Sequence, residues 1–331
     1  MDKIKIKISD FNIINDLPLW GNYRPSKFPN RHLYFRDISN PKSKSKRPFK
    51  ITLMLCYDDV KDKFTISFNG SIRKWYFGGN TRRNLSKNQL TECINLLSAA
   101  IEIKEQDLRN AKITQLETGI TLLLSSEFKK IINCFIKHRN FSREMNETTL
   151  YFKGKKTKEG FDSNYKYKIY EKYLEINKND KSFYDNPIKM NVHKKFIFFR
   201  FEIVIKKVSG VVFYKEKART FGDLLNNWTE INIELINRFQ SINFADLISK
   251  AKNTDVSKIG KRDSAKYLQF KAIDKNGFIE EFEKFEIHNT STNRSTKAKA
   301  FIKNYELFLE KKKDFKDELY FLFKKKIDSL I

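Results

Sequence analysis

The sequence predicts an α+β fold, in which a mostly antiparallel central sheet carries flanking helices and a helical region follows it. Segments with the two-residue alternation of half-buried strands dominate up to about residue 212, and segments with helical spacing dominate after it. With 331 residues and 40% hydrophobic content, the chain can build one large core or two smaller ones. We therefore predict an α+β part over residues 1–212 and a helical, lysine-rich part over residues 213–331.

The strand predictions rest on alternating apolar and polar residues bounded by turn residues. The first segment alternates lysine with isoleucine, and Gly78-Gly79-Asn80 closes the fourth segment as a turn. The expected strands are residues 1–8, 50–57, 62–69, 71–77, 111–124, 148–153, 165–175 and 196–207.

The helix predictions rest on apolar residues at helical spacing and on capping patterns. Ser86 precedes Gln89 by three residues, which is a capping-box pattern, and Thr220 precedes Asp223 in the same way. The expected helical segments are residues 86–101, 126–138, 221–239, 243–252 and 295–330.

The charge of the chain indicates a polyanionic partner. Lys and Arg number 66 against 40 Asp and Glu, so the formal net charge is +26. Nucleic acid is favoured over a membrane surface, because no apolar run approaches the roughly 18 residues of a spanning helix. The first residues lack the apolar stretch of a signal peptide. Three widely separated cysteines indicate reduced thiols, and we expect a cytoplasmic protein with no disulfide framework.

The apolar strand at residues 196–206 carries two charged residues that can do chemistry. Its odd positions are apolar, so Arg200 and Glu202 share the opposite face. In the strand expected at residues 111–124, Gln115 and Glu117 likewise share a face. Carboxylates are ligands that Mg²⁺ and Mn²⁺ prefer, so these faces are candidates for metal binding.

A tyrosine and two lysines share one face of the strand expected at residues 165–173. Tyr170, a possible phosphodiester nucleophile, lies on the same side as Lys168 and Lys172. Glu175 follows five residues after Tyr170 and can join it only through a bulge or a strand end. If the three polar faces coincide, carboxylates lie within a basic surface. The residues alone leave metal binding and ordinary ion pairing open, and ion pairing is the commoner outcome.

The order of these motifs resembles that of the filamentous-phage gene II/gene X replication proteins and, more distantly, the plasmid rolling-circle initiators. The resemblance covers about residues 65–225 and includes the family's Tyr-x-Lys-x-x-Glu and Arg-Phe-Glu motifs. Gln115 and Glu117 depart from it, because the family has arginine and aspartate there, and the chain has no His-x-His pair. The matching segments are residues 70–80, 113–117, 148–154, 169–175 and 200–206.

The resemblance implies a rolling-circle initiator fold and an endonuclease and strand transferase that nicks one DNA strand at an origin. Tyr170 would attack the phosphodiester to form a 5′-phosphotyrosyl bond, with Lys172 and Arg200 stabilising the phosphate. A divalent cation, Mg²⁺ or Mn²⁺, would polarise that phosphate, and host helicase or polymerase would be partners. The expected metal ligands are Glu117, Glu175 and Glu202. Nearby tyrosines are rival nucleophiles, namely Tyr151, Tyr167 and Tyr173.

Several basic residues are expected to contact DNA beside this site. The turn at residues 78–80 is a candidate for close approach to the DNA backbone, although a simple tight turn is commoner. The competing hypothesis is a non-catalytic DNA-binding replication or regulatory protein of a phage or plasmid, which predicts salt-sensitive binding without cleavage. An RNA-binding protein is a weaker alternative, because no typical RNA-binding motif occurs. The expected DNA contacts are Arg73, Lys74, Arg82, Arg83 and Lys168.

Overall fold

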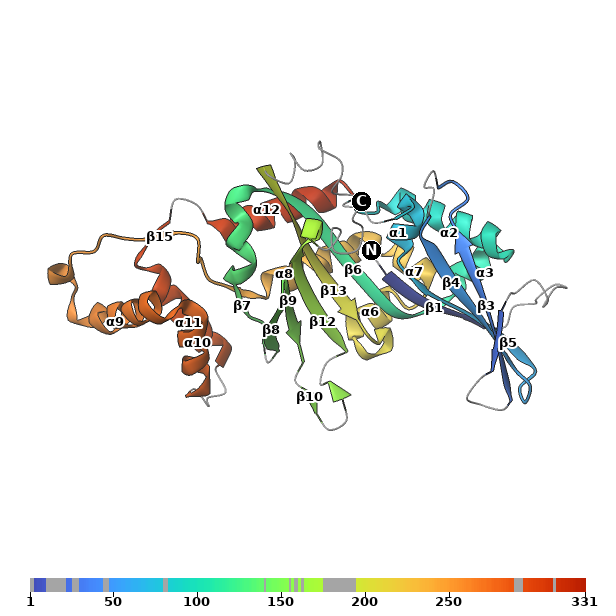
Figure 1. Ribbon diagram of the computed structural model, residues 1–331, viewed down its shortest axis with the longest axis horizontal. Helices are drawn as coiled ribbons and strands as arrows, with labels where there is room; N and C mark the ends of the chain where they lie inside the picture. Colours follow the sequence, from blue (N-terminus) through green and yellow to red (C-terminus); the bar gives the residue numbers. More distant parts are fainter. Residues whose placement is uncertain are drawn as a thin grey trace.

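The computed structural model has a ten-stranded sheet in which every paired strand is antiparallel, with helices beside it (Figure 1). The strand order is β2-β3-β4-β5-β1-β6-β13-β12-β9-β8. The predicted α+β class, with helices toward the C-terminal end, is confirmed. The structure describes residues 3–9, 22–25, 30–43, 48–79, 83–139, 141–154, 156–157, 160–161, 164–174, 195–288, 294–311 and 314–331.

The main sheet contains most of the strands that the alternation predicted. Three further strands, β2, β3 and β8, were not expected. The strands of this sheet are β1 Lys3–Ser9, β2 Asn22–Pro25, β3 Arg31–Ser39, β4 Lys50–Asp58, β5 Lys63–Gly70, β6 Lys112–Ser125, β8 Ser142–Asn146, β9 Thr149–Lys153, β12 Tyr165–Glu171 and β13 Phe196–Ile205. Short two-stranded pairs are β10 Lys156–Thr157 with β11 Gly160–Phe161, β14 Asn243–Phe244 with β7 Phe135–Lys137, and β15 Lys250–Ala251 with β16 Leu309–Glu310.

The helices follow each half of the sheet and then dominate the rest of the chain. Both predicted capping boxes are present, at the starts of α2 and α7. The helices are α1 Ile72–Phe77, α2 Lys87–Ile101, α3 Glu105–Asn110, α6 Val212–Lys217, α7 Phe221–Asn226, α8 Trp228–Gln240, α9 Lys261–Asn276, α10 Phe278–Ile287, α11 Arg294–Glu306 and α12 Phe315–Asp328.

The sheet repeats one topology on each side of the β1–β6 pair. In the first half β1 is innermost, β5 lies next to it, and β4, β3 and β2 follow outward. In the second half β6 is innermost, β13 lies next to it, and β12, β9 and β8 follow outward. In each half the first strand lies at the centre of the sheet and the second lies at its outer edge. Each later strand is antiparallel to the one before it and lies closer to the centre. The two halves place equivalent strands at equivalent positions, and helices come after each.

Helices from the C-terminal part cover the apolar face of β13. Phe199 and Phe201 lie on that face, and the ring of Phe323 in α12 is 6.4 Å and 5.9 Å from theirs. Phe323 also stacks on Phe239 of α8 at 4.3 Å. One hydrophobic core therefore contains residues from both sides of residue 212. The domain boundary expected there stays a prediction.

Three helices build most of a smaller core, to which Ile136 of β7 and Ala245 also contribute. Phe278 and Phe282 of α10 pack against Phe301 of α11, with ring centroids 5.7 Å and 5.5 Å apart. In Figure 1, α9, α10 and α11 lie to one side of the sheet, while α12 returns to it. The helical region expected after residue 212 is thus divided between the main core and this outlying group.

The strand expected at residues 71–77 is wrong, because this segment is the helix α1. Ser71 caps it by accepting a hydrogen bond from the backbone N–H of Lys74 at 3.1 Å. Ile72 and Trp75 lie one helical turn apart and are both fully buried. Gly78 ends the helix in the left-handed conformation, with φ of 79°. A serine cap and a glycine stop outweighed the strand propensity of the aromatic residues between them.

Five other predicted elements also differ. Residues 126–134 form a 3₁₀ helix that leads into β7, and residues 243–252 contain two short strands rather than a helix. The segments expected at residues 221–239 and 295–330 are each split into two helices. Predicted strand 165–175 ends at Glu171. Caps divide the two long helical segments, at Asn227 between α7 and α8 and at Asp314 before α12. Residues 243–244 and 250–251 are extended because they pair with β7 and β16, which lie far away in the sequence.

The three cysteines are free, as expected from their spacing. Cys93 and Cys134 are buried, and burial raises the pKa of both thiols. Cys56, on β4, is partly exposed. Within the described ranges, no helix combines the length and the apolar character needed to cross a membrane.

We expect Phe323→Ala to lower the free energy of unfolding by about 3–5 kcal/mol, because it opens a cavity between α8, α12 and β13. Phe321→Ala is the matched control, since Phe321 lies on the same helix but is 64% exposed. Urea unfolding followed by circular dichroism measures both variants. Equal stability of the two variants would show that α12 does not contribute to the main core.

Candidate functional site

The strand register brings the predicted polar faces together. Across β12 and β13, Tyr170 is paired with Arg200 and Lys168 with Glu202. Across β6 and β13, Gly119 is paired with Glu202. Directly paired residues of neighbouring strands point to the same side of a sheet. The polar faces of these three strands therefore coincide, and they meet on the side opposite the aromatic core.

Glu202 is the centre of a cluster of polar side chains. Its Oε1 accepts hydrogen bonds from the Tyr170 hydroxyl at 2.8 Å and from Arg200 Nε at 2.5 Å. Its Oε2 accepts one from Lys168 Nζ at 3.4 Å, and Lys168 also binds Glu117 Oε1 at 2.9 Å. Glu202 is 1% exposed and Arg200 is fully buried. The carboxylate is thus held by two cations and one hydroxyl in the interior.

Two neutral residues that sequence reasoning missed hold Arg200 in place. Arg200 Nη1 donates to Thr121 Oγ1 at 2.7 Å and to Asn84 Oδ1 at 3.3 Å. The Asn84 amide also binds the backbone of Thr121 in both directions, at 3.3 Å and 3.1 Å. Asn84 thereby satisfies backbone groups of β6 with its side chain. Because Asn84 and Thr121 are 37 residues apart, no local pattern indicates this contact.

Gly119 provides the space that the Glu202 side chain occupies. A Cβ atom at residue 119 would lie 2.6 Å from Glu202 Cγ and 2.6 Å from the carbonyl oxygen of Phe201. Neither distance is tolerated, so a side chain here would push Glu202 or the strand away. A glycine inside a long strand is the sequence signal for such a close approach, and it stood within the strand expected at residues 111–124.

Tyr170 belongs to this cluster and is 6% exposed to solvent. Lys172 follows on the helical turn after β12, and its Nζ is 5.5 Å from the centroid of the Tyr170 ring. Tyr167 is on the opposite face of β12 and packs against Phe201 at 5.6 Å. Tyr151 is paired through β9 with Lys168, on the polar face. Tyr170 is thus the candidate nucleophile that the structure joins to the carboxylate.

The remaining predicted site residues are placed as follows. Glu175 and Arg82 lie outside the described residues. Arg73 is fully buried, and its Nη1 donates to the carbonyl oxygen of Arg83 at 3.2 Å, so it lies in the interior instead of on a surface that DNA can reach. Lys74 is partly exposed and Arg83 is exposed.

Further lysines lie on the same polar face of the sheet, at a greater distance from Tyr170. Lys166 is directly opposite Lys153 across β12 and β9. Partial burial lowers the pKa of Lys166, and Lys168, Lys153 and Lys206 lower it further. Burial and the charge of Lys153 also lower the pKa of Lys206. Like charges held this close destabilise the free protein, and an anion bound between them would relieve the repulsion.

Two carboxylates of the cluster converge on one cation, as ligands of a magnesium or manganese ion would. Glu117 and Glu202 come from two strands and converge on a single cation, the Lys168 ammonium, at 2.9 Å and 3.4 Å. Mg²⁺ commonly uses one or two carboxylates together with phosphate oxygens of the substrate. Over the described part of the chain, no group of three or more His, Cys, Asp or Glu residues is arranged for a metal ion.

A hollow with apolar walls opens beside the cluster. It encloses about 800 Å³ and reaches Thr121, whose hydroxyl binds Arg200. Leu123 and Phe198 are among the apolar residues that line it. The basic residues Arg83, Lys325 and Lys326 also line it. Apolar and basic side chains together suit an unpaired nucleotide, whose base is flat and whose phosphate is charged.

We expect Gly119→Ala to lower the free energy of unfolding by about 1–3 kcal/mol, because the added methyl group overlaps Glu202 and the backbone of β13. Gly79→Ala is the matched control, since a Cβ atom there meets nothing within 4 Å. Thermal and urea unfolding of both variants measure the effect. If the two variants unfold alike, the packing of Glu202 over Gly119 is not as close as the structure shows.

We expect Lys166→Gln to raise the free energy of unfolding at neutral pH by about 0.2–1 kcal/mol, because it removes a like-charge pair across two strands. The folded state lowers the pKa of Lys166, so wild-type stability should rise with pH as this lysine loses its proton. The advantage of the variant should therefore shrink as the pH rises toward about 10, near the pKa of an unfolded lysine, and should change little above it. Lys50→Gln, at an exposed position on β4, is the control. A stability loss in Lys166→Gln would contradict the repulsion.

Comparison of the chain with protein-family models, curated proteins and solved structures gives no match. The functional assignment therefore depends on the chemistry of the cluster around Glu202 and on the charge of the sheet face that contains it.

Proposed function

We propose that this protein nicks one strand of DNA through Tyr170 and can rejoin the ends, as a replication initiator does. The observation that carries the proposal is the 2.8 Å hydrogen bond from the Tyr170 hydroxyl to Glu202, in a cluster that also contains Arg200 and Lys168. A potential nucleophile, a proton acceptor and cations for a phosphate thus occur together. This is the combination that transfer of a phosphodiester to a tyrosine requires.

The proton of Tyr170 is the first chemical problem, because a phenol has a pKa near 10 and is a weak nucleophile at neutral pH. Glu202 already accepts the hydrogen bond of this hydroxyl, so it is the group placed to take the proton. The Tyr170 oxygen then attacks phosphorus, a 5′-phosphotyrosyl bond forms, and the bond from phosphorus to the 3′ oxygen breaks. The 3′ oxygen takes a proton from water and leaves as a hydroxyl, and Glu202 returns the proton of Tyr170 to water, so no net proton is consumed. Because one ester replaces another, the reverse reaction rejoins the strand.

Positive charge beside Tyr170 supports the same reaction. Lys172 lies over the Tyr170 ring, and Arg200 is paired with Tyr170 across the two strands. A phosphoryl group being transferred concentrates negative charge on its oxygens, which fixed cations stabilise. In a water-poor interior this stabilisation is stronger than in solution. Lys172 and Arg200 are therefore proposed as phosphate-stabilising residues.

A divalent cation, Mg²⁺ or Mn²⁺, is part of the proposal. Glu117 and Glu202 would hold it, with Glu175 as a further ligand from outside the described residues. When bound, such an ion polarises the phosphate and lowers the cost of its developing charge. The chain's own contribution would be to move the Lys168 ammonium, which now lies between the two carboxylates, toward the phosphate.

The proposed substrate is DNA at a replication origin, in single-stranded or supercoiled form. The net charge of +26 and the lysines that surround the cluster support a polyanionic substrate. Arg83 and Lys168 are proposed as DNA contacts, together with the partly exposed Lys74. A host helicase or polymerase would use the free 3′ end. We place the protein in the cytoplasm, where such replication occurs.

A second candidate function is a DNA-binding replication or regulatory protein without catalysis. The burial of Tyr170 favours it, because a residue that is 6% exposed must become accessible before it can attack DNA. In that case the Arg200–Glu202 pair would serve to fix the register of β12, β13 and β6. The charged face would then bind DNA without cutting it.

We expect Tyr170→Phe to abolish nicking, because phenylalanine cannot form the phosphotyrosyl bond. The test incubates the protein with Mg²⁺ or Mn²⁺ and a supercoiled plasmid that contains its coding DNA and flanking sequence. The products are digested with protease and resolved on a denaturing gel. A nick with a blocked 5′ end, seen with wild type and lost in the variant, is the expected result.

Tyr167→Phe is the matched control, since Tyr167 lies on the same strand with its side chain on the opposite face. This variant should keep full nicking activity. A nick that survives Tyr170→Phe would move the nucleophile to another tyrosine. Salt-sensitive binding with no nick under either metal would favour the non-catalytic candidate.

A further inference from the structure

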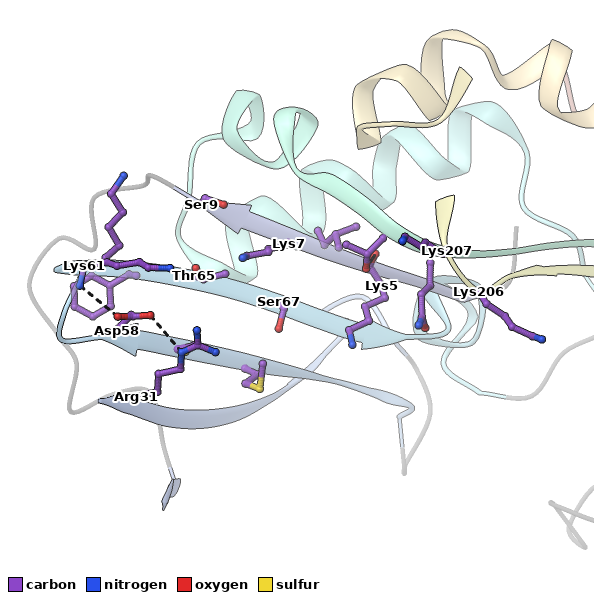
Figure 2. Close-up of a pocket in the computed structure, with 17 residues that line it drawn as sticks. Lys5, Lys7, Ser9, Arg31, Asp58, Lys61, Thr65, Ser67, Lys206 and Lys207 are labelled. Atoms are coloured by element: carbon purple, nitrogen blue, oxygen red, sulfur yellow. Dashed lines mark hydrogen bonds and ion pairs between the residues drawn. The ribbon is translucent and has the colours of Figure 1, made fainter. Parts of the chain in front are cut away.

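The first half of the sheet contains a basic hollow that the proposed nicking chemistry does not use. It encloses about 740 Å³ on the polar face, between strands of the first half and the end of β13 (Figure 2). Hydroxyl and amide groups lie between its charged residues, at Ser9, Thr65, Ser67 and Gln115. The charged residues that line it are Lys5, Lys7, Arg31, Asp58, Lys61, Lys63, Lys206 and Lys207.

The charge of this hollow is almost entirely positive. Among the described residues that line it, Asp58 is the one carboxylate, and Arg31 binds it at 3.3 Å. Lys5 and Lys7 alternate along β1 with isoleucines that are buried on the other face. No described side chain forms an ion pair with Lys5, Lys7 or Lys207. Among the described residues, Lys5, Lys7 and Lys207 therefore lack counter-ions, and an anionic ligand would supply them.

The shape of the basic surface indicates an extended ligand rather than a compact one. Figure 2 shows the cations as a row that runs from Lys206 and Lys207 past Lys5 and Lys7 to Arg31. This row crosses β13, β6, β1, β5, β4 and β3 in sheet order. At about 4.8 Å between neighbouring strands, it spans roughly 24 Å. A single phosphate or nucleotide would fill a fraction of it, whereas a chain of phosphates would cover it.

The row continues toward the candidate active site. Lys206 is close enough to Lys153 and Lys166 for their charges to affect one another. Lys166 is two residues from Lys168, which binds both carboxylates of the cluster. The hollow in the first half and the Tyr170 cluster in the second half thus share one face of the sheet. A continuous line of positive charge joins them.

We propose that this hollow is a track for the phosphate backbone of single-stranded DNA, which it holds while Tyr170 acts on another part of the same strand. The inference rests on the proposed function and names a second contact region of its substrate. A row of lysines with small hydroxyl residues between them contacts phosphates and sugars without selecting bases. Sequence selection is therefore left to other parts of the protein.

Cys56 provides a direct probe of the track, because its thiol lines the hollow and the other two cysteines are buried. The experiment measures the rate at which N-ethylmaleimide alkylates Cys56 at about pH 8, with and without an oligothymidine strand. We expect the strand to slow alkylation at least tenfold, and a duplex of equal length to protect much less. An unchanged rate with the single strand, or equal protection by the duplex, would overturn the proposal.

Charge removal gives an independent measurement. The triple variant Lys5→Gln, Lys7→Gln, Lys207→Gln removes three phosphate contacts, so the logarithmic salt dependence of oligothymidine binding should become shallower by about 0.7 × 3 ≈ 2. The matched control changes three exposed lysines of the outlying helices, Lys261, Lys275 and Lys303, to Gln. Both variants lose the same net charge. If the control changes the slope as much, the binding is not localised to the hollow.

Different experimental results would contradict the proposed nicking reaction and the proposed phosphate track. Binding and Cys56 protection are measured with Tyr170→Phe, which cannot form a covalent product. Protection without any nicking by the wild type would keep the track and reject the nicking reaction. Nicking by a protein whose Cys56 is never protected would keep the reaction and reject the track.

Discussion

The buried pair of Arg200 and Glu202 constrains the polar face of the sheet more than any other interaction. Two opposite charges two residues apart on one strand are almost completely removed from water, which is costly unless each remaining hydrogen-bonding group finds a partner. β12 supplies Lys168 and Tyr170 to Glu202, and β6 leaves a glycine where the Glu202 side chain passes. A shift of one residue in register would turn these partners to the other face, so the pair fixes three strands.

The two halves of the sheet have one topology and different chemistry. The half that begins with β6 combines carboxylates, a tyrosine and lysines, whereas the half that begins with β1 presents lysines with few acidic neighbours on the same face. The aromatic core on the opposite face stabilises both halves and allows the polar face to carry excess positive charge. Like charges that destabilise the free protein are understandable where a polyanion binds, because the ligand supplies the missing negative charge.

Sequence reasoning located most strands of the main sheet and both capping boxes, since these depend on local alternation and on residues three apart. It also placed Arg200, Glu202, Tyr170 and Lys168 on polar faces. It did not anticipate Asn84, whose role depends on a contact with a strand 37 residues away. Nor did it anticipate that residues 72–77 would form a helix, because six residues with mixed polarity satisfy either pattern and the flanking Ser and Gly decide. Local sequence patterns predict individual helices and strands, whereas the site depends on which strands pair and in which register.

The geometry of the polar face bears on the form of DNA that the proposed nicking reaction would require. Arg200 lies opposite Tyr170, and Lys206 lies six residues farther along the same chain, which is about 20 Å at the rise of a strand. The basic row beyond Lys206 crosses several strands and also follows the length of β1, on which Lys5 and Lys7 lie two residues apart. Neighbouring strands of a sheet are rotated by about 20–25° from one another, so the face that joins the two regions is twisted. Duplex DNA, with a persistence length of about 150 base pairs, resists bending over such a surface, whereas a single strand follows it readily. The arrangement therefore favours a strand that is already unpaired at Tyr170, the proposed nucleophile.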